Sequence, residues 1–143
     1  MSTPPNMNEF NKKIIAEFRA NDGVVGGMFA GHPVMLLTTT GAKSGRRFTL
    51  PLMYLPDGER IVIFASKAGA PTNPDWYHNL VANPVVTVEA GTETFDANAT
   101  VVTGDARDQL YAQQVAQMPQ FGDYERKTTR TIPVIRLERV SPA

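Results

Sequence analysis

Residues 35–55 limit how this chain can fold more than any other stretch, because two apolar runs flank a short cationic turn. The first run, residues 35–40, is rich in residue types that suit a pleated sheet. In the second run, residues 47–55, apolar side chains recur at alternate positions, which is the period of a strand with one buried face. Pro51 cannot donate a ladder hydrogen bond, so this second strand must lie at a sheet edge or be bulged. We therefore expect a hairpin whose second strand bends near Pro51.

The turn between these strands, residues 41–46, combines two glycines with the cations Lys43 and Arg46, and Arg47 follows directly. Glycine allows backbone angles that other residues resist. Positive charge beside free amides and a hydroxyl suits a phosphate or carboxylate ligand. The same composition is typical of an ordinary solvated hairpin tip, because turns are polar and glycine-rich in any case. From these residues alone, both interpretations stay open.

The totals exclude several classes of protein and of site. A length of 143 residues predicts a single domain, which we place at residues 8–143 after a flexible tail at residues 1–7. The net charge of zero argues against a nucleic-acid-binding domain. The chain has no cysteine, and its two histidines lack metal-ligand spacing. We therefore expect no disulfide, no thiolate chemistry and no metal site.

The amino-terminal residues do not read as a signal peptide, and the longest apolar runs are too short to cross a bilayer. A cytoplasmic location is the default expectation. Residues 8–19 carry apolar side chains at spacings of three and four, which predicts a helix. We expect its apolar face to cover the core. The alternative is peripheral contact of this face with a membrane surface.

The rest of the chain predicts a sheet of short strands with helices at its margins. Strands are expected at residues 60–66, 85–89, 94–103 and 132–140, and helices at residues 74–82 and 105–118. Asn73 and Asp105 are the expected helix caps. Residues 119–129 are expected to form an irregular, aromatic-bearing loop. The predicted fold class is mainly β with flanking helices (α+β), arranged as a small antiparallel barrel.

Several loops carry candidate binding residues, provided that they meet at one end of the barrel. They are the turn at Lys43, the bend at Pro51, the segment 66–67, the helix with Trp76 and Asn79, the loop with Phe121 and Tyr124, and a glycine-rich link that contains Met28. This set offers cations, amides and an indole but few acid–base groups. It suits a flat ring with an anionic tail, whose chemistry belongs to a cofactor. The alternative is that Trp76 only anchors its helix on the barrel.

Six short motifs then occur in a fixed order along the chain. They are LLTTTGAKSG at 36–45, PLMYL at 51–55, ASKAGAP at 65–71, NPDWYHNL at 73–80, NP at 83–84 and RTIPV at 130–134. Together they resemble the deazaflavin (F420)-dependent nitroreductase family of actinobacteria. The resemblance implies a split β-barrel of the flavin-binding type that holds coenzyme F420, an 8-hydroxy-5-deazaflavin with a phosphate and an oligoglutamate tail. It also implies an oxidoreductase that transfers hydride from reduced F420 to an electron-poor acceptor.

The resemblance assigns cofactor-binding roles by position. The phosphate and the glutamates would be held by Lys43, Ser44, Arg46 and Arg47. The ring would be lined by Pro51, Leu52, Met53, Ala65, Ser66 and Lys67, with Trp76 and Asn79 closing the site beside it. The family often has basic residues where Ala42 and Phe48 stand here. In this chain Arg46 and Arg47 would compensate by displacement.

The resemblance also indicates which residues meet the acceptor. Tyr124 is the first candidate for a proton donor or positioner and Ser66 the second. The expected substrate-binding residues are Met28, Met53, Met118, Phe121 and Tyr124. Met118 and Phe121 stand where nitroimidazole-reducing members have tyrosines, so we expect apolar acceptors such as quinones or conjugated enones and poor reduction of nitroimidazoles. Two alternatives are an FMN-binding reductase on the same barrel and a non-catalytic carrier of deazaflavin or a lipophilic ligand.

Overall fold

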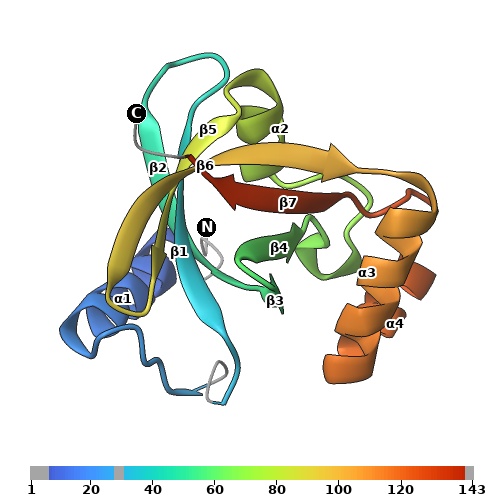
Figure 1. The fold of residues 1–143 in the computed structure, drawn as a ribbon, viewed down its shortest axis with the longest axis horizontal. Helices are drawn as coiled ribbons and strands as arrows, with labels where there is room; N and C mark the ends of the chain where they lie inside the picture. Colours follow the sequence, from blue (N-terminus) through green and yellow to red (C-terminus); the bar gives the residue numbers. More distant parts are fainter. Residues whose placement is uncertain (1–6, 28–30, 141–143) are drawn as a thin grey trace, which may run out of the picture.

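The computed structural model describes residues 7–27 and 31–140, which form one curled sheet with helices around it (Figure 1). Within these residues, seven strands pair antiparallel in the order β2-β1-β5-β6-β7-β4-β3. The strands are β1 (Val34–Thr40), β2 (Arg47–Met53), β3 (Leu55–Asp57), β4 (Arg60–Phe64), β5 (Val85–Ala90), β6 (Glu93–Val102) and β7 (Val134–Arg139). The α-helices are α1 (Met7–Ala20), α2 (Asp75–Ala82), α3 (Gly104–Gln117) and α4 (Gln120–Lys127). The mainly β architecture with flanking helices is confirmed.

The two edges of the sheet are consecutive in the sequence. β2 and β3 lie at opposite ends of the strand order, yet only Tyr54 separates them along the chain. Continuing from one edge directly to the other draws the edges together and gives the sheet its curl. Pro51 pairs with Leu36 in β1 and has no strand on its other side, so its missing N–H donor breaks no hydrogen bond to a second strand. The predicted edge position of this strand is confirmed.

The inner face of the curled sheet is the main core. Ile61 and Ile63 of β4 and Ile135 and Leu137 of β7 alternate into it, as the period of a strand requires. Trp76 and Leu80 of α2 belong to the same buried cluster. With only 7% of its surface exposed, Trp76 anchors α2 on the sheet.

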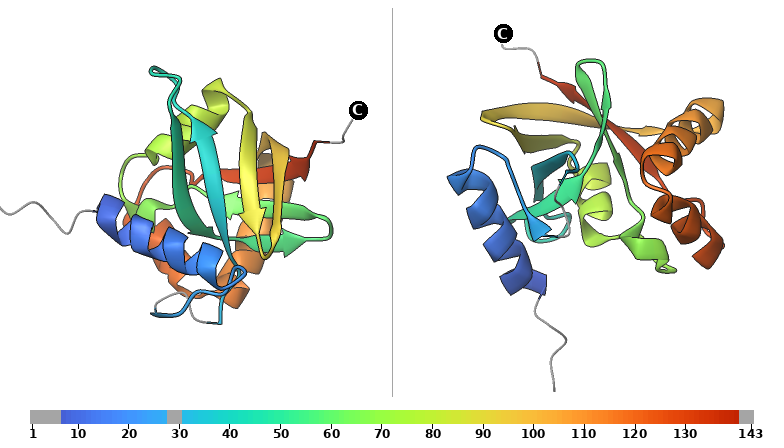
Figure 2. Two further views of the ribbon diagram at one scale, coloured as in Figure 1. Left: turned by 90° about the vertical axis from the view of Figure 1, so that its left-hand side faces the viewer. Right: turned by 90° about the horizontal axis from the view of Figure 1, so that it is seen from below.

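The outer face is covered at two separate places. Phe18 of α1 packs against Val34 and Leu36 of β1. Across the molecule, α3 and α4 cover Phe64 of β4 and the start of β7. Figures 1 and 2 show α1 and the α3–α4 pair at opposite ends of the sheet, with α2 between them. The apolar face of α1 therefore covers the core, which was the expectation.

Three local expectations were wrong. Residues 119–129 are not an irregular loop, because Gln120–Lys127 form α4. Phe121 lies on a buried helix face there, and a glycine at position 122 had weakened the local helix signal. Asn73 does not cap α2, because the Asn73 Oδ1 instead accepts a hydrogen bond from Arg130. The cap position of α2 is Pro74. Asp105 lies in the first turn of α3 rather than at its cap, which is Thr103.

Two further findings concern membrane-spanning helices and metal sites. In the described ranges, no helix combines the length and the apolar character needed to cross a membrane. The same residues contain no group of three or more histidine and carboxylate side chains placed to hold a metal ion.

Candidate functional site

The cationic turn is a tight, internally bonded loop. The Gly41 amide donates to the Arg46 carbonyl at 2.7 Å, and the Gly45 amide donates to the Gly41 carbonyl at 3.1 Å. A side chain at Gly41 would stand 2.6 Å from Ser44 Oγ and 2.9 Å from the Phe48 ring, so any larger residue would require these two side chains to shift. Ser44 Oγ accepts from the Arg46 amide at 3.1 Å. The hydroxyl that was expected to meet a ligand therefore also shapes the turn.

The cations of this turn are only partly compensated. Lys43 and Arg46 are exposed, and neither forms an ion pair with any described residue. The Arg46 guanidinium lies 5.9 Å from the Phe48 ring centroid. Arg47 instead donates to Thr87 Oγ1 on β5 at 2.7 Å. The turn thus presents two positive charges without an internal carboxylate, which suits an anionic ligand.

α2 holds the turn from the side. Asn79 Oδ1 accepts from the Ala42 amide at 3.0 Å, and Asn79 Nδ2 donates to Thr39 Oγ1 at 3.2 Å. One helical turn later, Asn83 Nδ2 donates to the Thr40 carbonyl at 3.2 Å. Both ends of the Asn79 amide are thus engaged within the protein. Its geometry fits positioning of the turn.

One arginine holds the loop that leads into α2, residues 65–73, through hydrogen bonds. Arg130 donates to the carbonyls of Ala65 at 3.1 Å, Ser66 at 2.9 Å and Ala70 at 2.9 Å, and to Asn73 Oδ1 at 2.7 Å. Burial lowers the pKa of this guanidinium from its ordinary value. Arg130 begins the motif at residues 130–134, and the sequence pattern predicted no role for it. An arginine at the entry to an apolar strand was the available signal.

The same loop packs against α4. It contains the short 3-10 helix η2 (Lys67–Gly69), in which Lys67 has φ +46° and Gly69 has φ +83°. A side chain on Gly69 would stand 3.0 Å from the Tyr124 carbonyl and 2.9 Å from Lys127 Cβ. Glycine at this position lets η2 approach the helix that carries Phe121 and Tyr124.

The residues expected to meet the acceptor gather in one cluster beneath α3 and α4. Met118 and Phe121 are buried there, and Met53 and Tyr124 are partly buried against them. The Tyr124 ring meets the Phe121 ring edge-on, with centroids 5.1 Å apart. Tyr124 and Met53 are therefore the members of this set with accessible surface. Met28 lies outside the described residues.

The expected ring-lining residues differ in how much surface they expose. Pro51, Ala65 and Ser66 are buried, whereas Leu52 and Met53 are half-buried. Lys67 is exposed, and its Nζ donates to Thr72 Oγ1 at 3.3 Å. The expected site residues thus fall into two groups in the structure. One is the cationic turn with Asn79, and the other is the segment around Ser66 with α4. α2 and the loop before it connect the two groups.

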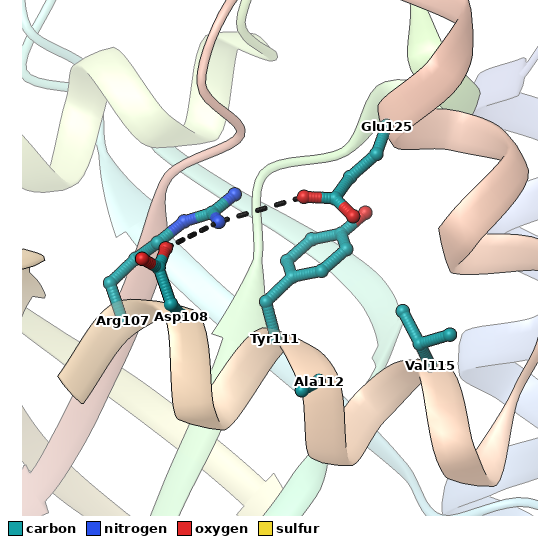
Figure 3. A pocket seen from close by; sticks show the side chains of 6 residues that line it. All are labelled: Arg107, Asp108, Tyr111, Ala112, Val115 and Glu125. Carbon is teal, nitrogen blue, oxygen red and sulfur yellow. Dashed lines mark hydrogen bonds and ion pairs between the residues drawn. The ribbon is translucent and has the colours of Figure 1, made fainter. Parts of the chain in front are cut away.

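A cavity of about 340 Å³ lies elsewhere, between α3 and α4 (Figure 3). Its polar lining groups are engaged with one another. Arg107 pairs with Asp108 at 3.0 Å and with Glu125 at 3.6 Å, and it also donates twice to the Ile132 carbonyl. Tyr111 donates to the Phe121 carbonyl at 2.6 Å. A second cavity of about 400 Å³ is also lined by Arg107 and Asp108 and reaches Tyr77 of α2. Neither cavity is lined by an expected site residue, and these contacts join α3, α4 and the start of β7.

Comparison with known proteins identifies the relatives of this arrangement. The family model described as F420H2-dependent quinone reductase matches residues 11–139. An F420H2-dependent quinone reductase of Mycobacterium tuberculosis is 38% identical over 128 residues, which cover 87% of this chain and 86% of the relative. A solved structure described as an F420H2-dependent reductase is 39% identical with a TM-score of 0.69, over 74% of this chain and 94% of its own. Another, described as a domain-swapped dimer, is 33% identical with a TM-score of 0.71, over 93% of this chain and 100% of its own.

Proposed function

This chain belongs to the F420H2-dependent quinone reductase family, and from that premise we propose that it transfers hydride from reduced F420 to a quinone. When bound, F420H2 supplies the hydride. The protein has to hold the coenzyme by its tail, orient its ring and bring the acceptor against it. The observation that carries the proposal is the exposed pair Lys43 and Arg46, which has no carboxylate partner among the described residues.

The donor set of the turn fits the tail of F420. Phosphate and glutamate groups are anionic acceptors, and lysine and arginine are the side chains that bind them most strongly. Ser44 and Asn79 keep the turn in shape through their hydrogen bonds to the Arg46 and Ala42 amides. In this proposal Lys43 and Arg46 bind the tail, with Arg47 beside them on β2.

In this proposal the ring lies beside the segment at Ser66 and Lys67, which itself packs against α4. Met53 and Tyr124 are the two expected site residues of the nearby cluster that keep accessible surface, which supports contact with the ring or the acceptor. Tyr124 makes no side-chain hydrogen bond to any described residue. Its hydroxyl is therefore free to give a proton to, or position, the reduced acceptor. Ser66 is the second candidate, because its hydroxyl makes no capping bond to η2.

The proposed acceptor preference depends on the side chains that pack behind Tyr124. Met118 and Phe121 are buried there and supply bulk without hydroxyls, so we propose quinones or conjugated enones rather than nitroimidazoles as acceptors. Phe121→Tyr adds a hydroxyl at this position. We expect the variant to reduce a nitroimidazole several-fold faster than the wild type, with F420 binding unchanged. Efficient nitroimidazole reduction by the wild type would end this part of the proposal.

The direct test is a pair of fluorescence titrations, one with F420 and one with FMN, followed by mixing F420H2 with a panel of quinones. We expect binding of F420 and oxidation of F420H2 only when protein and quinone are both present. Binding without oxidation would favour a carrier, and preference for FMN would favour the flavin alternative.

The apolar face of α1 packs on β1, which leaves little apolar surface on this helix for contact with a membrane. Co-sedimentation with anionic vesicles tests it.

A further inference from the structure

We propose that Arg130 is a positioning residue for the coenzyme, because its guanidinium fixes residues 65–73 in the conformation that receives the deazaflavin ring. This inference rests on the proposed function, which places the ring beside Ser66 and Lys67. It concerns a residue that touches neither the ring nor the acceptor in that proposal. Arg130 acts through the backbone of the loop.

The first argument is the number and direction of the contacts. One guanidinium donates to three backbone carbonyls and one side-chain amide oxygen, all in the loop and all between 2.7 and 3.1 Å. Arginine has five donors in a rigid planar fork, so it imposes one arrangement on several acceptors at once. Lysine has a single ammonium and cannot span this set of acceptors.

The second argument is the direction in which the hydrogen bonds of Arg130 orient the amides of Ser66 and Lys67. In a trans peptide the C=O and N–H groups point in opposite directions, and the described residues contain no cis peptide. Because the Ala65 and Ser66 carbonyls face Arg130, the amides of Ser66 and Lys67 point away from it. These two amides form no hydrogen bond with any described residue. They are therefore donors suited to the carbonyl oxygens of a flat heterocycle.

The third argument is the backbone that the grip maintains. Lys67 has φ +46°, a left-handed conformation that L side chains other than asparagine and aspartate rarely adopt. Such a conformation persists only where the surroundings over-determine it, and it is frequent at ligand sites. Arg130 holds the carbonyl before Lys67 and the carbonyl of Ala70 after it. Without these bonds the loop would relax toward ordinary backbone angles.

The expected effect is on coenzyme affinity. If Arg130→Lys lowers the fraction of loop in the receptive conformation to about one-tenth, the apparent dissociation constant of F420 rises about tenfold. We expect the KM for F420H2 to rise by a similar factor and the KM for a benzoquinone acceptor to change less than twofold. Amide hydrogen exchange gives a local readout, since the Gly69 and Ala70 amides donate to the Ser66 and Lys67 carbonyls. Their exchange should accelerate in the variant.

The matched control is Arg107→Lys. Arg107 is also a mostly buried arginine that donates to a backbone carbonyl, but it holds Ile132 to α3 and forms no hydrogen bond or ion pair with residues 65–73. We expect it to lower the melting temperature and to leave the dissociation constant of F420 within twofold of the wild type. Asn73→Ala is the milder second variant, because it removes only the bond from Arg130 to Oδ1. It should raise the dissociation constant about threefold.

The outcomes separate the two proposals. A wild type that does not bind F420 refutes the proposed function, and this inference with it. A wild type that binds F420, with Arg130→Lys and Asn73→Ala binding equally well, refutes the role of Arg130 alone. Faster exchange at Gly69 and Ala70 together with weaker binding supports it. Equal losses of affinity in Arg130→Lys and Arg107→Lys would reduce Arg130 to a residue that only stabilises the fold.

Discussion

Asn79→Ala tests whether the cationic turn must be held from the side in order to bind the coenzyme. In the structure the Asn79 amide accepts from the Ala42 amide at 3.0 Å and donates to Thr39 Oγ1 at 3.2 Å. The substitution deletes both bonds and leaves the charges of Lys43 and Arg46 in place. It therefore changes the order of the turn without changing its electrostatics.

The size of the effect follows from the two lost bonds. A neutral hydrogen bond contributes about 0.5–1.5 kcal/mol net, so the turn loses roughly 1–3 kcal/mol of restraint. Alanine favours a helix interior over asparagine by about 0.5 kcal/mol, which offsets part of the global loss. We expect a net destabilisation of about 1–2 kcal/mol. If F420 binding has to restore all of the lost order of the turn, a restraint loss of 1.4 kcal/mol makes the complex about tenfold weaker.

The assay is F420 fluorescence titration of the wild type, Asn79→Ala and the control Asn83→Ala. Asn83 lies one helical turn later and donates to the Thr40 carbonyl at 3.2 Å, but it does not touch the amide of the turn. Both variants should lower the melting temperature by a few degrees, since about 1 kcal/mol shifts it by roughly 2–4 °C at this size. Only Asn79→Ala should weaken F420 binding substantially. Equal affinities in all three proteins would show that the turn does not need this support, and would refute the reasoning.

Two further predictions concern charge and pH. Lys43→Ala should weaken F420 binding about three- to fivefold at low salt and flatten its salt dependence, because it deletes one proposed contact to the polyanionic tail. Substitution of the exposed Lys12 by alanine is the control, and an unchanged salt slope would remove the turn from the site. Burial raises the pKa of the Tyr111 hydroxyl to about 12, against an ordinary value of 10.0. The contribution of this raised pKa to stability, roughly 3 kcal/mol, is fully present below pH 10 and is lost as the pH rises from 10 to 12. Tyr111→Phe should be less stable at neutral pH, for want of the bond to the Phe121 carbonyl, and should show a shallower decline in denaturant midpoints between pH 10 and 12; equally steep declines would contradict this.

Local patterns predicted the parts of the fold that local physics decides. Alternation in residues 47–55 and the missing donor of Pro51 required an edge strand, and β2 is one. The helix α1 follows from its apolar spacing for the same reason. The helix α4 could not be predicted this way, because Gly122 weakens its propensity and burial of Phe121 supplies the compensation. That burial depends on Phe64 and Tyr111, whose rings meet Phe121 edge-on from β4 and α3.

The candidate site shows the same division between what is near and what is distant in the sequence. The cations of the turn are visible in residues 43–47, but the side chains that fix the backbone around the site come from far away. Asn79 reaches the turn across 37 residues, and Arg130 reaches the loop across 57 to 65 residues. A sequence pattern names such residues only by type, whereas the direction of each donor depends on the closed sheet. Asn79 orders the turn that is proposed to bind the tail, and Arg130 orders the loop that is proposed to face the ring. A single substitution at either position should therefore affect one half of the proposed coenzyme site. The two halves can then be tested separately, and combining Asn79→Ala with Arg130→Lys should give nearly additive losses in binding free energy.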